Sequence, residues 1–317
     1  MKMSSLPGLD AAPVVFEPGS PAHRPIAALL EWTRSETALL TDTLHRAGAI
    51  LFRDFDIEGP AGLAQAATAL GGALQNYVGG DSPRAQAADK IYNSTEFPAH
   101  LPIELHNELS YAGWWPSRIF FYCDIEPENG GQTPIGDSRA IYKALPADLR
   151  QRFETKGVRY IQNMHKGVGP QKSWQDTFET DDPAVVEAYC EKHGMDYRWT
   201  DYGLRTSILR QAVITHPATG EKAWFNQAEH WHAAVKGVRF WDAGAAAADE
   251  DRLPAHCTFG DGEPIGREDL ETILAVSKQA ERAFDWRRGD LLMLDNLITA
   301  HGRRPFAGAR RILVAMA

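Results

Sequence analysis

Near the carboxyl end of the chain, two short apolar runs lie on either side of one histidine. Residues 291–296 and 311–316 are mostly aliphatic, and a turn-forming stretch, 286–290, precedes the first run. Runs this short, bounded by glycine and polar residues, are typical of core strands rather than helices. His301 lies between the two predicted strands and is followed by Gly302. We therefore expect an imidazole at the end of a buried strand, a position suited to holding a metal ion.

The amino-terminal part of the chain predicts helices alternating with strands. Apolar residues recur at helical spacing over residues 26–45, and Gly48 follows as a stop signal. Residues 49–55 are rich in strand formers, and a weaker helical pattern covers residues 61–74. A further apolar run at residues 117–124 predicts another core strand.

Composition limits the classes of protein to consider. The 317 residues are 44% hydrophobic and 24% charged, so the chain can bury a sizeable core, and we expect one decorated domain over residues 1–317. The net charge of −9 disfavours nucleic acid and anionic membranes as partners and leaves small molecules or proteins. No apolar run suggests a signal peptide or a membrane span, so we expect a cytoplasmic protein. The three cysteines form no CxxC pair.

His106 and Glu108 form a His-x-Glu pair that could supply two further metal ligands. On an extended chain, side chains two residues apart lie on the same face. The pair alone is weak evidence, because a simple salt bridge would produce the same spacing. Together with His301 it makes two histidines and one carboxylate, which leave three positions open on iron(II), whereas zinc usually fills a tetrahedral site.

Three segments in this order resemble one enzyme family: residues 106–111, residues 130–134, and residues 295–303 with 310–312. The chain is similar, over about residues 49–316, to the taurine dioxygenase and 2,4-dichlorophenoxyacetate dioxygenase-like iron(II)/2-oxoglutarate enzymes. This resemblance implies a mainly β protein with a double-stranded β-helix (jelly-roll) core, helices outside and a lid insertion, which we place at about residues 151–235. Most members have aspartate where Glu108 stands.

The same resemblance implies where the co-substrate 2-oxoglutarate would bind. Thr133 and Arg311 match the threonine and arginine that hold its distal carboxylate, which calls for a buried guanidinium. Arg310 is adjacent, and by strand alternation it should point the other way. We expect Arg311 to enter the site.

The resemblance further implies the reaction. We expect Fe(II), 2-oxoglutarate and O₂ to oxidise, and most often hydroxylate, an amino acid or a derivative, with release of succinate and CO₂. The motifs are closest to enzymes of nonribosomal peptide and antibiotic biosynthesis, whose substrates are free or tethered to a carrier protein. Desaturation, epoxidation and cyclisation stay open, as does a homo-oligomeric state. The rival classes are a zinc hydrolase and a non-catalytic jelly-roll binding protein, which metal analysis and a succinate assay would separate.

Four other side chains are candidates for binding the substrate. Tyr111 and Trp115 follow the first two ligands, although aromatic residues beside a strand often belong to the core. Asn93 precedes the metal-bearing strand and could equally form a local turn. Arg205 lies in the insertion and could face a substrate carboxylate.

Overall fold

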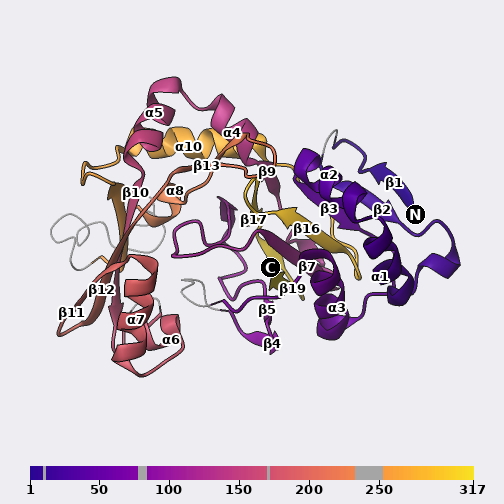
Figure 1. The fold of residues 1–317 in the computed structure, drawn as a ribbon, viewed down its shortest axis with the longest axis horizontal. Helices are drawn as coiled ribbons and strands as arrows, with labels where there is room; N and C mark the ends of the chain where they lie inside the picture. The colour runs from indigo at the N-terminus through magenta and orange to yellow at the C-terminus, as the bar shows by residue number, and fades with distance from the viewer. Residues whose placement is uncertain (10–11, 78–83, 170–171, 233–252) are drawn as a thin grey trace.

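A computed structural model describes residues 1–9, 12–77, 84–169, 172–232 and 253–317. Its largest sheet has eight strands, drawn from both ends of the chain (Figure 1). Their order is β1 (Lys2–Ser5), β2 (Val14–Glu17), β3 (Ala49–Phe52), β16 (Leu291–Asp295), β7 (Arg118–Ile125), β19 (Arg311–Met316), β5 (Ile91–Asn93) and β4 (Gln86–Ala88). The three apolar runs at residues 117–124, 291–296 and 311–316 are thus neighbouring central strands, as β7, β16 and β19.

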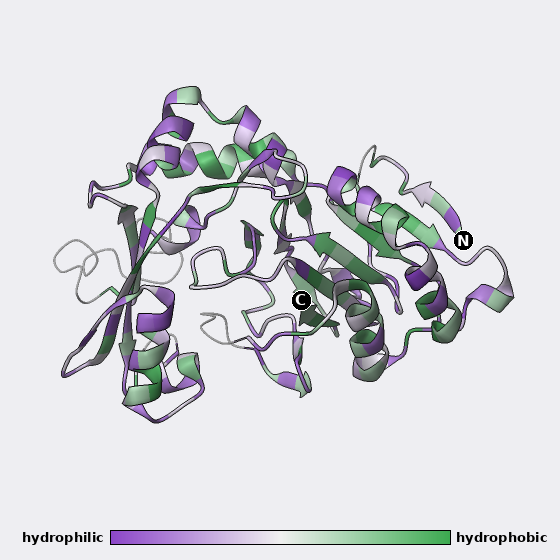
Figure 2. Ribbon diagram, in the orientation of Figure 1, coloured by the Kyte–Doolittle hydropathy of each residue, from purple (hydrophilic) through white to green (hydrophobic). Residues whose placement is uncertain are grey.

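Both faces of the central strands are buried, which explains why their sequences are almost continuously apolar. Leu292 and Leu294 of β16 face one hydrophobic core, and Leu291 and Met293 face a second core on the other side. The second core is covered by helices α1 (Ile26–Ser35), α2 (Thr37–Ala47) and α3 (Gly59–Gly71). Figure 2 shows the apolar residues concentrated on these strands.

A three-stranded sheet carries the two metal-candidate histidines. It has the order β6 (Ile103–His106), β17 (Thr299–Arg303) and β9 (Ile135–Asp137), all antiparallel. Strand β17 follows β16 after only residues 296–298, so the two sheets are connected directly beside His301. Two further short strands, β18 (Phe306–Ala307) and β8 (Asn129–Gly130), form an antiparallel pair. In sequence, β18 follows shortly after β17, and β8 shortly precedes β9.

The segment expected as a lid, residues 151–235, forms mostly regular structure. Its strands β11 (Asp196–Trp199), β12 (Gly203–Arg210) and β10 (Val158–His165) join β15 (Ala255–Phe259) in a four-stranded sheet. Figure 1 shows this sheet on the side of the molecule away from α1–α3. Helices α6 (Trp174–Phe178) and α7 (Pro183–His193) pack with it around a separate hydrophobic core. Residues 170–171 and 233–235 of the expected lid lie outside the described part of the chain.

The remaining elements connect these layers. They are η1 (Pro21–His23), α4 (Ser138–Ala144), α5 (Ala147–Lys156), β13 (Val213–Thr215), β14 (Lys222–Trp224), α8 (Ala228–Trp231) and α10 (Arg267–Ala280). The helix expected over residues 26–45 is two helices, because Glu36 (φ −111°, ψ 26°) leaves the helical conformation between them. Gly48 ends α2 in the left-handed region at φ 75°, as a glycine stop signal should. Among the described residues, no helix has the length and apolar character needed to cross a membrane.

Candidate active site

Strand pairing brings the two histidines together from distant parts of the chain. His106, the last residue of β6, lies directly opposite His301 in the middle of β17, and their ring centroids are 4.5 Å apart. The expectation that His301 ends the strand of residues 291–296 was wrong. Residues 296–298 form a turn, so His301 belongs to the next strand, with neighbours on both sides.

Glu108 reaches the histidines from a turn rather than from a strand. Strand β6 ends at His106, and Leu109 adopts the left-handed conformation at φ 56°. Asn296, fully buried, fixes this turn: its Oδ1 accepts from the Glu108 amide at 2.7 Å, and its Nδ2 donates to the Glu108 carbonyl at 3.0 Å. The carboxylate Oε2 of Glu108 then lies 3.5 Å from Nε2 of His301.

The electrostatics of the three residues favour a bound cation. Nδ1 of His106 lies 3.0 Å from the Glu104 carbonyl, so Nδ1 carries the proton and Nε2 keeps its lone pair for a metal. Burial and then the adjacent His301 lower the pKa of His106 to about 4, so its imidazole is neutral at neutral pH. Burial would raise the pKa of Glu108, but the charges of Arg84 and the two histidines lower it overall, and Glu108 stays ionised.

This donor set fits iron(II). One ligand atom from each of His106, Glu108 and His301 lies within 4.8 Å of the others; Glu108 and His301 are buried, and His106 is partly buried. Nδ1 of His301 has no hydrogen-bond partner among the described residues. Two imidazoles and one carboxylate on one side of a cation are the arrangement of non-haem iron(II) oxygenases.

Arg84 is a charged residue beside this site that the sequence did not reveal. Its Nη2 donates to Oε2 of Glu108 at 2.8 Å, and its guanidinium lies over the Tyr77 ring at 4.2 Å. The side chain is 5% exposed. No motif surrounds Arg84 in the sequence, so only long-range folding could place it next to Glu108.

The structure reverses the expected orientations of Arg310 and Arg311. Arg311 is 42% exposed on its side chain and forms an ion pair with Asp124 at 3.1 Å, so it does not enter the site. Arg310 is the inward arginine: its Nε donates to the Gly131 carbonyl at 2.9 Å and its Nη1 to Oγ of Ser94 at 3.4 Å. The two side chains point in different directions, as alternation predicts, but the register that placed Arg311 inward was wrong: β19 begins at Arg311, and its pairing with β7 shifts between Arg311 and Ile312.

Gly131 explains how Arg310 reaches the interior. A Cβ at this position would lie 2.9 Å from Cδ of Arg310, so a larger residue would obstruct the arginine. Thr133, two residues further on, is buried, and its hydroxyl accepts from Nε1 of Trp286 at 3.1 Å. It lies two residues before Ile135, which pairs with His301. The glycine-rich segment at residues 130–134 was therefore a signal for the inward arginine that the sequence analysis did not use.

The four substrate-binding candidates lie in different surroundings. Tyr111 packs on Trp231 at a ring distance of 4.8 Å, and Trp115 packs on Phe225 at 5.3 Å, so both contribute to hydrophobic cores. Asn93 ends β5, and its Oδ1 is buried without a partner among the described residues. Arg205 lies on β12 and donates to Asn163 at 3.3 Å. None of these contacts assigns a substrate.

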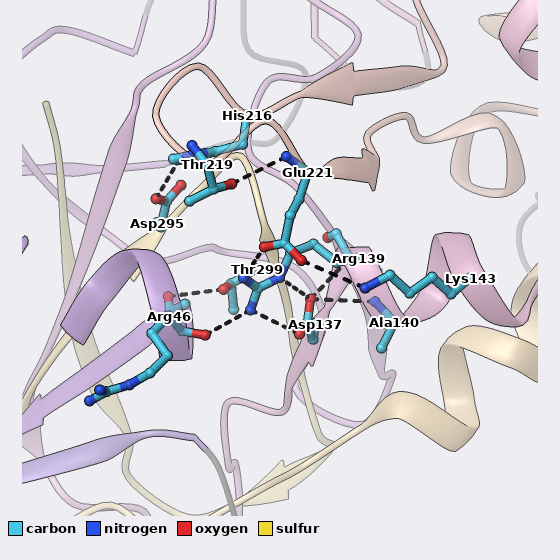
Figure 3. Close-up of polar contacts among 12 residues, drawn as sticks. Arg46, Asp137, Arg139, Ala140, Lys143, His216, Thr219, Glu221, Asp295 and Thr299 are labelled. Atoms are coloured by element: carbon cyan, nitrogen blue, oxygen red, sulfur yellow. Dashed lines mark hydrogen bonds and ion pairs between the residues drawn. The ribbon is translucent and has the colours of Figure 1, made fainter. Parts of the chain in front are cut away.

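A second group with a similar composition comprises His45, His216 and Asp295. Nε2 of His216 lies 3.0 Å from Oδ2 of Asp295, and Nδ1 of His216 accepts from the Thr219 amide at 3.1 Å (Figure 3). Both nitrogens of His216 are therefore used within the protein. This arrangement is a hydrogen-bonded connection between β16 and the loop after β13 rather than a metal site.

Comparison with known proteins agrees with this geometry. Residues 12–317 match the model of the taurine catabolism dioxygenase TauD, TfdA family. The dapdiamide synthesis protein DdaC of Enterobacter agglomerans is 35% identical over 278 residues, covering 87% of this chain and 84% of DdaC. A clavaminate synthase-like protein of Arabidopsis thaliana is 31% identical over 319 residues, covering 96% and 93% of the two chains.

Solved structures show the same fold at low sequence identity. PvcB, an Fe, alpha-ketoglutarate dependent oxygenase from an isonitrile synthetic pathway, superposes with a TM-score of 0.51 at 17% identity, covering 96% of this chain and 84% of PvcB. AAD-2, solved with Mn(II) and N-oxalylglycine, gives a TM-score of 0.55 at 16% identity, covering 89% and 87%.

The fold and site thus define a non-haem iron oxygenase that depends on 2-oxoglutarate. The chain belongs to the TauD/TfdA dioxygenase family. Its cofactors are Fe(II), 2-oxoglutarate and O₂, as the sequence predicted. The family assignment also argues against the two rival classes, a zinc hydrolase and a non-catalytic binding protein.

Proposed function

We propose that this enzyme hydroxylates an amino acid or an amino-acid derivative in specialised metabolism, with iron held by His106, Glu108 and His301. The observation that carries the proposal is the convergence of these three side chains within 4.8 Å. The substrate class is supported by the relatives, since DdaC is named for dapdiamide synthesis and PvcB for an isonitrile pathway. Another relative, pentalenolactone F synthase, belongs to the same kind of metabolism, so desaturation, epoxidation or cyclisation at this site is the alternative.

We further propose that the two sheets containing β16 and β17 are the halves of a double-stranded β-helix. Antiparallel pairing of β6 with β17 in one sheet, and of β7 with β16 in the other, supports this. The four-stranded sheet formed by β10–β12 and β15 would then close the open end when substrate binds. Slower hydrogen exchange in β10–β12 on substrate addition would support closure, and unchanged exchange there would argue against it. A small-molecule substrate and a cytoplasmic location fit the composition. We also propose that the substrate can be presented on a carrier protein and that the enzyme can form a homo-oligomer.

The protein side chains have distinct tasks in this reaction. His106 and His301 bind as neutral imidazoles, and Glu108 binds as an anion, so together they neutralise half the charge of the cation. Bound iron with 2-oxoglutarate supplies the oxidising power, because O₂ converts 2-oxoglutarate to succinate and CO₂. The buried Thr133 hydroxyl and the Arg310 guanidinium are suited to orient the distal carboxylate of 2-oxoglutarate.

Arg310 has the electrostatics of a carboxylate site. Burial and then the nearby Arg303 cation lower the pKa of Arg310 to about 10, and none of its hydrogen bonds described here is to an acidic side chain. A buried guanidinium without a counter-anion gains most from a bound carboxylate. We therefore propose Arg310, in place of Arg311, as the 2-oxoglutarate arginine.

Paired arginine variants test this assignment. Arg310→Ala should raise the 2-oxoglutarate concentration for half-saturation about 100-fold, the factor expected when ~3 kcal/mol of a buried charged contact is lost. Arg311→Ala is the matched control: it removes an exposed ion pair worth ~0–1 kcal/mol and should change half-saturation little. The measurement is an anaerobic 2-oxoglutarate titration of the Fe(II) protein, followed by the charge-transfer band and confirmed by succinate formation. The opposite ranking of the two variants would restore the assignment of Arg311.

A further inference from the structure

Arg84 places an incompletely paired cation beside the metal ligands. Its side chain is 5% exposed, and its only described hydrogen bond is from Nη2 to Oε2 of Glu108, at 2.8 Å. Nε and Nη1 are buried and have no hydrogen-bond partner within the part of the chain that the structure describes. A guanidinium has five N–H donors in a fixed plane, and buried donors without partners are costly. The structure therefore leaves hydrogen-bonding capacity unused at this position.

A metal bound to Glu108 would weaken the ion pair between Glu108 and Arg84. The oxygen that accepts from Arg84 is Oε2, the same atom that lies 3.5 Å from Nε2 of His301. A cation held between Glu108 and His301 would draw on the negative charge of this oxygen. Arg84 would then be a buried cation next to another cation, an arrangement that calls for a second anion.

The described hydrogen bonds and ion pairs of Arg84 include no second anion. Glu108 is the charged group that acts most strongly on the Arg84 guanidinium, and the Tyr77 and Tyr111 hydroxyls contribute as well. Arg310 lies against Gly131, Ser94 and the Phe306 ring and shares no described contact with Arg84. The arginine proposed for the distal carboxylate of 2-oxoglutarate is thus separate from Arg84, which leaves Arg84 available for another ligand.

We propose that Arg84 binds a carboxylate of the substrate and so positions that substrate beside the metal. The inference rests on the proposed function and narrows it: the substrate is a free carboxylic acid, such as an unactivated amino acid, rather than an acid joined to a carrier through that carboxyl group. The ring of Tyr77, 4.2 Å from the guanidinium, holds Arg84 in its orientation. Nε and Nη1 donate in different directions, so each can give one charge-assisted hydrogen bond to an oxygen of a bound carboxylate.

The test compares free acids with neutral analogues. The twenty free L-amino acids and their methyl esters are added separately to the anaerobic protein with Fe(II) and 2-oxoglutarate. Binding is read from the perturbation of the charge-transfer band and needs no turnover. At least one free amino acid should perturb the band, and its ester should bind about 10- to 100-fold more weakly, the factor for a charge-assisted hydrogen bond. A response to esters alone, or to none of the free acids, would overturn the proposal.

Variants of Arg84 assign the effect to this residue. Arg84→Gln should weaken binding of the free amino acid by the same factor, so that the free acid and its ester bind equally well. Arg84→Lys should bind the free acid more tightly than Arg84→Gln does, because the lysine keeps the positive charge. Arg24→Gln, which removes an exposed ion pair with Asp56, should behave as the unaltered protein. Equal acid and ester affinities in the unaltered protein, or retained discrimination in Arg84→Gln, would refute the role of Arg84.

The complex of the protein with Fe(II) and 2-oxoglutarate, measured before any amino acid is added, distinguishes a failure of this inference from a failure of the proposed function. If the unaltered protein forms no charge-transfer band with Fe(II) and 2-oxoglutarate, the proposed function fails. If that band forms normally but is lost in both Arg84→Gln and Arg84→Lys, Arg84 serves the metal or co-substrate, and the substrate assignment is wrong.

Discussion

Two groups of histidines and carboxylates in this protein have the same kinds of side chain and opposite properties. In the group of His106, Glu108 and His301, one ligand atom from each side chain lies within 4.8 Å of the others, and Nδ1 of His301 has no partner among the described residues. In the group of His45, His216 and Asp295, both nitrogens of His216 are hydrogen-bonded, and Oδ1 of Asp295 accepts from the Leu297 amide at 3.0 Å. The comparison teaches that hydrogen-bond saturation, rather than composition, separates a structural group from a metal site.

The second group still supports the first. Asp295 is the last residue of β16, and the next residue, Asn296, holds the turn that presents Glu108. Through His216, Asp295 is connected to the loop after β13, near the ion pairs that Arg139 makes with Asp137 and Glu221 (Figure 3). The saturated group therefore fixes the backbone from which the metal site is built.

The largest expected effect distinguishes the two histidine groups directly. His301→Ala should weaken Fe(II) binding by at least ~100-fold, because even residues that only support ligands cost ~10–100-fold when changed. His216→Ala should leave Fe(II) affinity nearly unchanged. Anaerobic Fe(II) titration of both variants measures this. A large loss of iron affinity in His216→Ala alone would mean that the assignments of the two groups are reversed.

A smaller effect is expected on how the free energy of unfolding depends on pH, and it comes from Glu229, a buried carboxyl outside both groups. Burial, with a contribution from Glu104, raises the pKa of Glu229 to about 8, whereas Glu108, beside Arg84, has a lowered pKa. The folded protein thus keeps a proton on Glu229 that the unfolded chain loses near pH 4.5. Between these values the unfolded state binds fewer protons, so this carboxyl makes stability fall as pH rises.

Denaturant unfolding from pH 6.5 to 8 measures the contribution of Glu229. In that range the decrease due to this residue should be about 2 kcal/mol, at 1.36 kcal/mol per pH unit. Glu229→Gln should remove the decrease. The buried imidazoles of His106 and His232, whose pKa values are lowered to about 4, act in the opposite direction but only below about pH 6.5. Equal pH slopes for Glu229→Gln and the unaltered protein would show that Glu229 is already ionised.

An effect of similar size is expected on the free energy of unfolding that the group of His45, His216 and Asp295 contributes. His216→Ala leaves the buried Asp295 carboxylate without one partner and should lower the free energy of unfolding by ~1–3 kcal/mol. Thermal or denaturant unfolding of the metal-free protein checks this value. His23→Ala provides the control, because His23 is exposed and bonds only the nearby Ser20 hydroxyl. A His216→Ala protein as stable as the control would remove the structural role given to this group.

Local patterns in the sequence were sufficient for many of the elements. The apolar runs became β7, β16 and β19, and Gly48 ended α2, because burial and backbone freedom act on neighbouring residues. The prediction of a single helix over residues 26–45 was wrong, because the spacing of apolar residues does not reveal that the backbone leaves the helical conformation at Glu36. The expected orientations of the two arginines were also wrong, because the family resemblance placed Arg311 inward, whereas β19 begins at Arg311 with an irregular register.

The sequence by itself was sufficient to predict the candidate ligands: His106, Glu108 and His301 lie in segments that resemble one family, and the structure brings them within 4.8 Å of one another. Only the tertiary structure decided which charges surround them. Arg84 reaches Glu108 from 24 residues away and Asn296 from 188, and neither contact follows from local spacing. The physical reason is that hydrogen bonds and ion pairs depend on distances below about 4 Å, which long-range strand pairing sets and sequence separation does not.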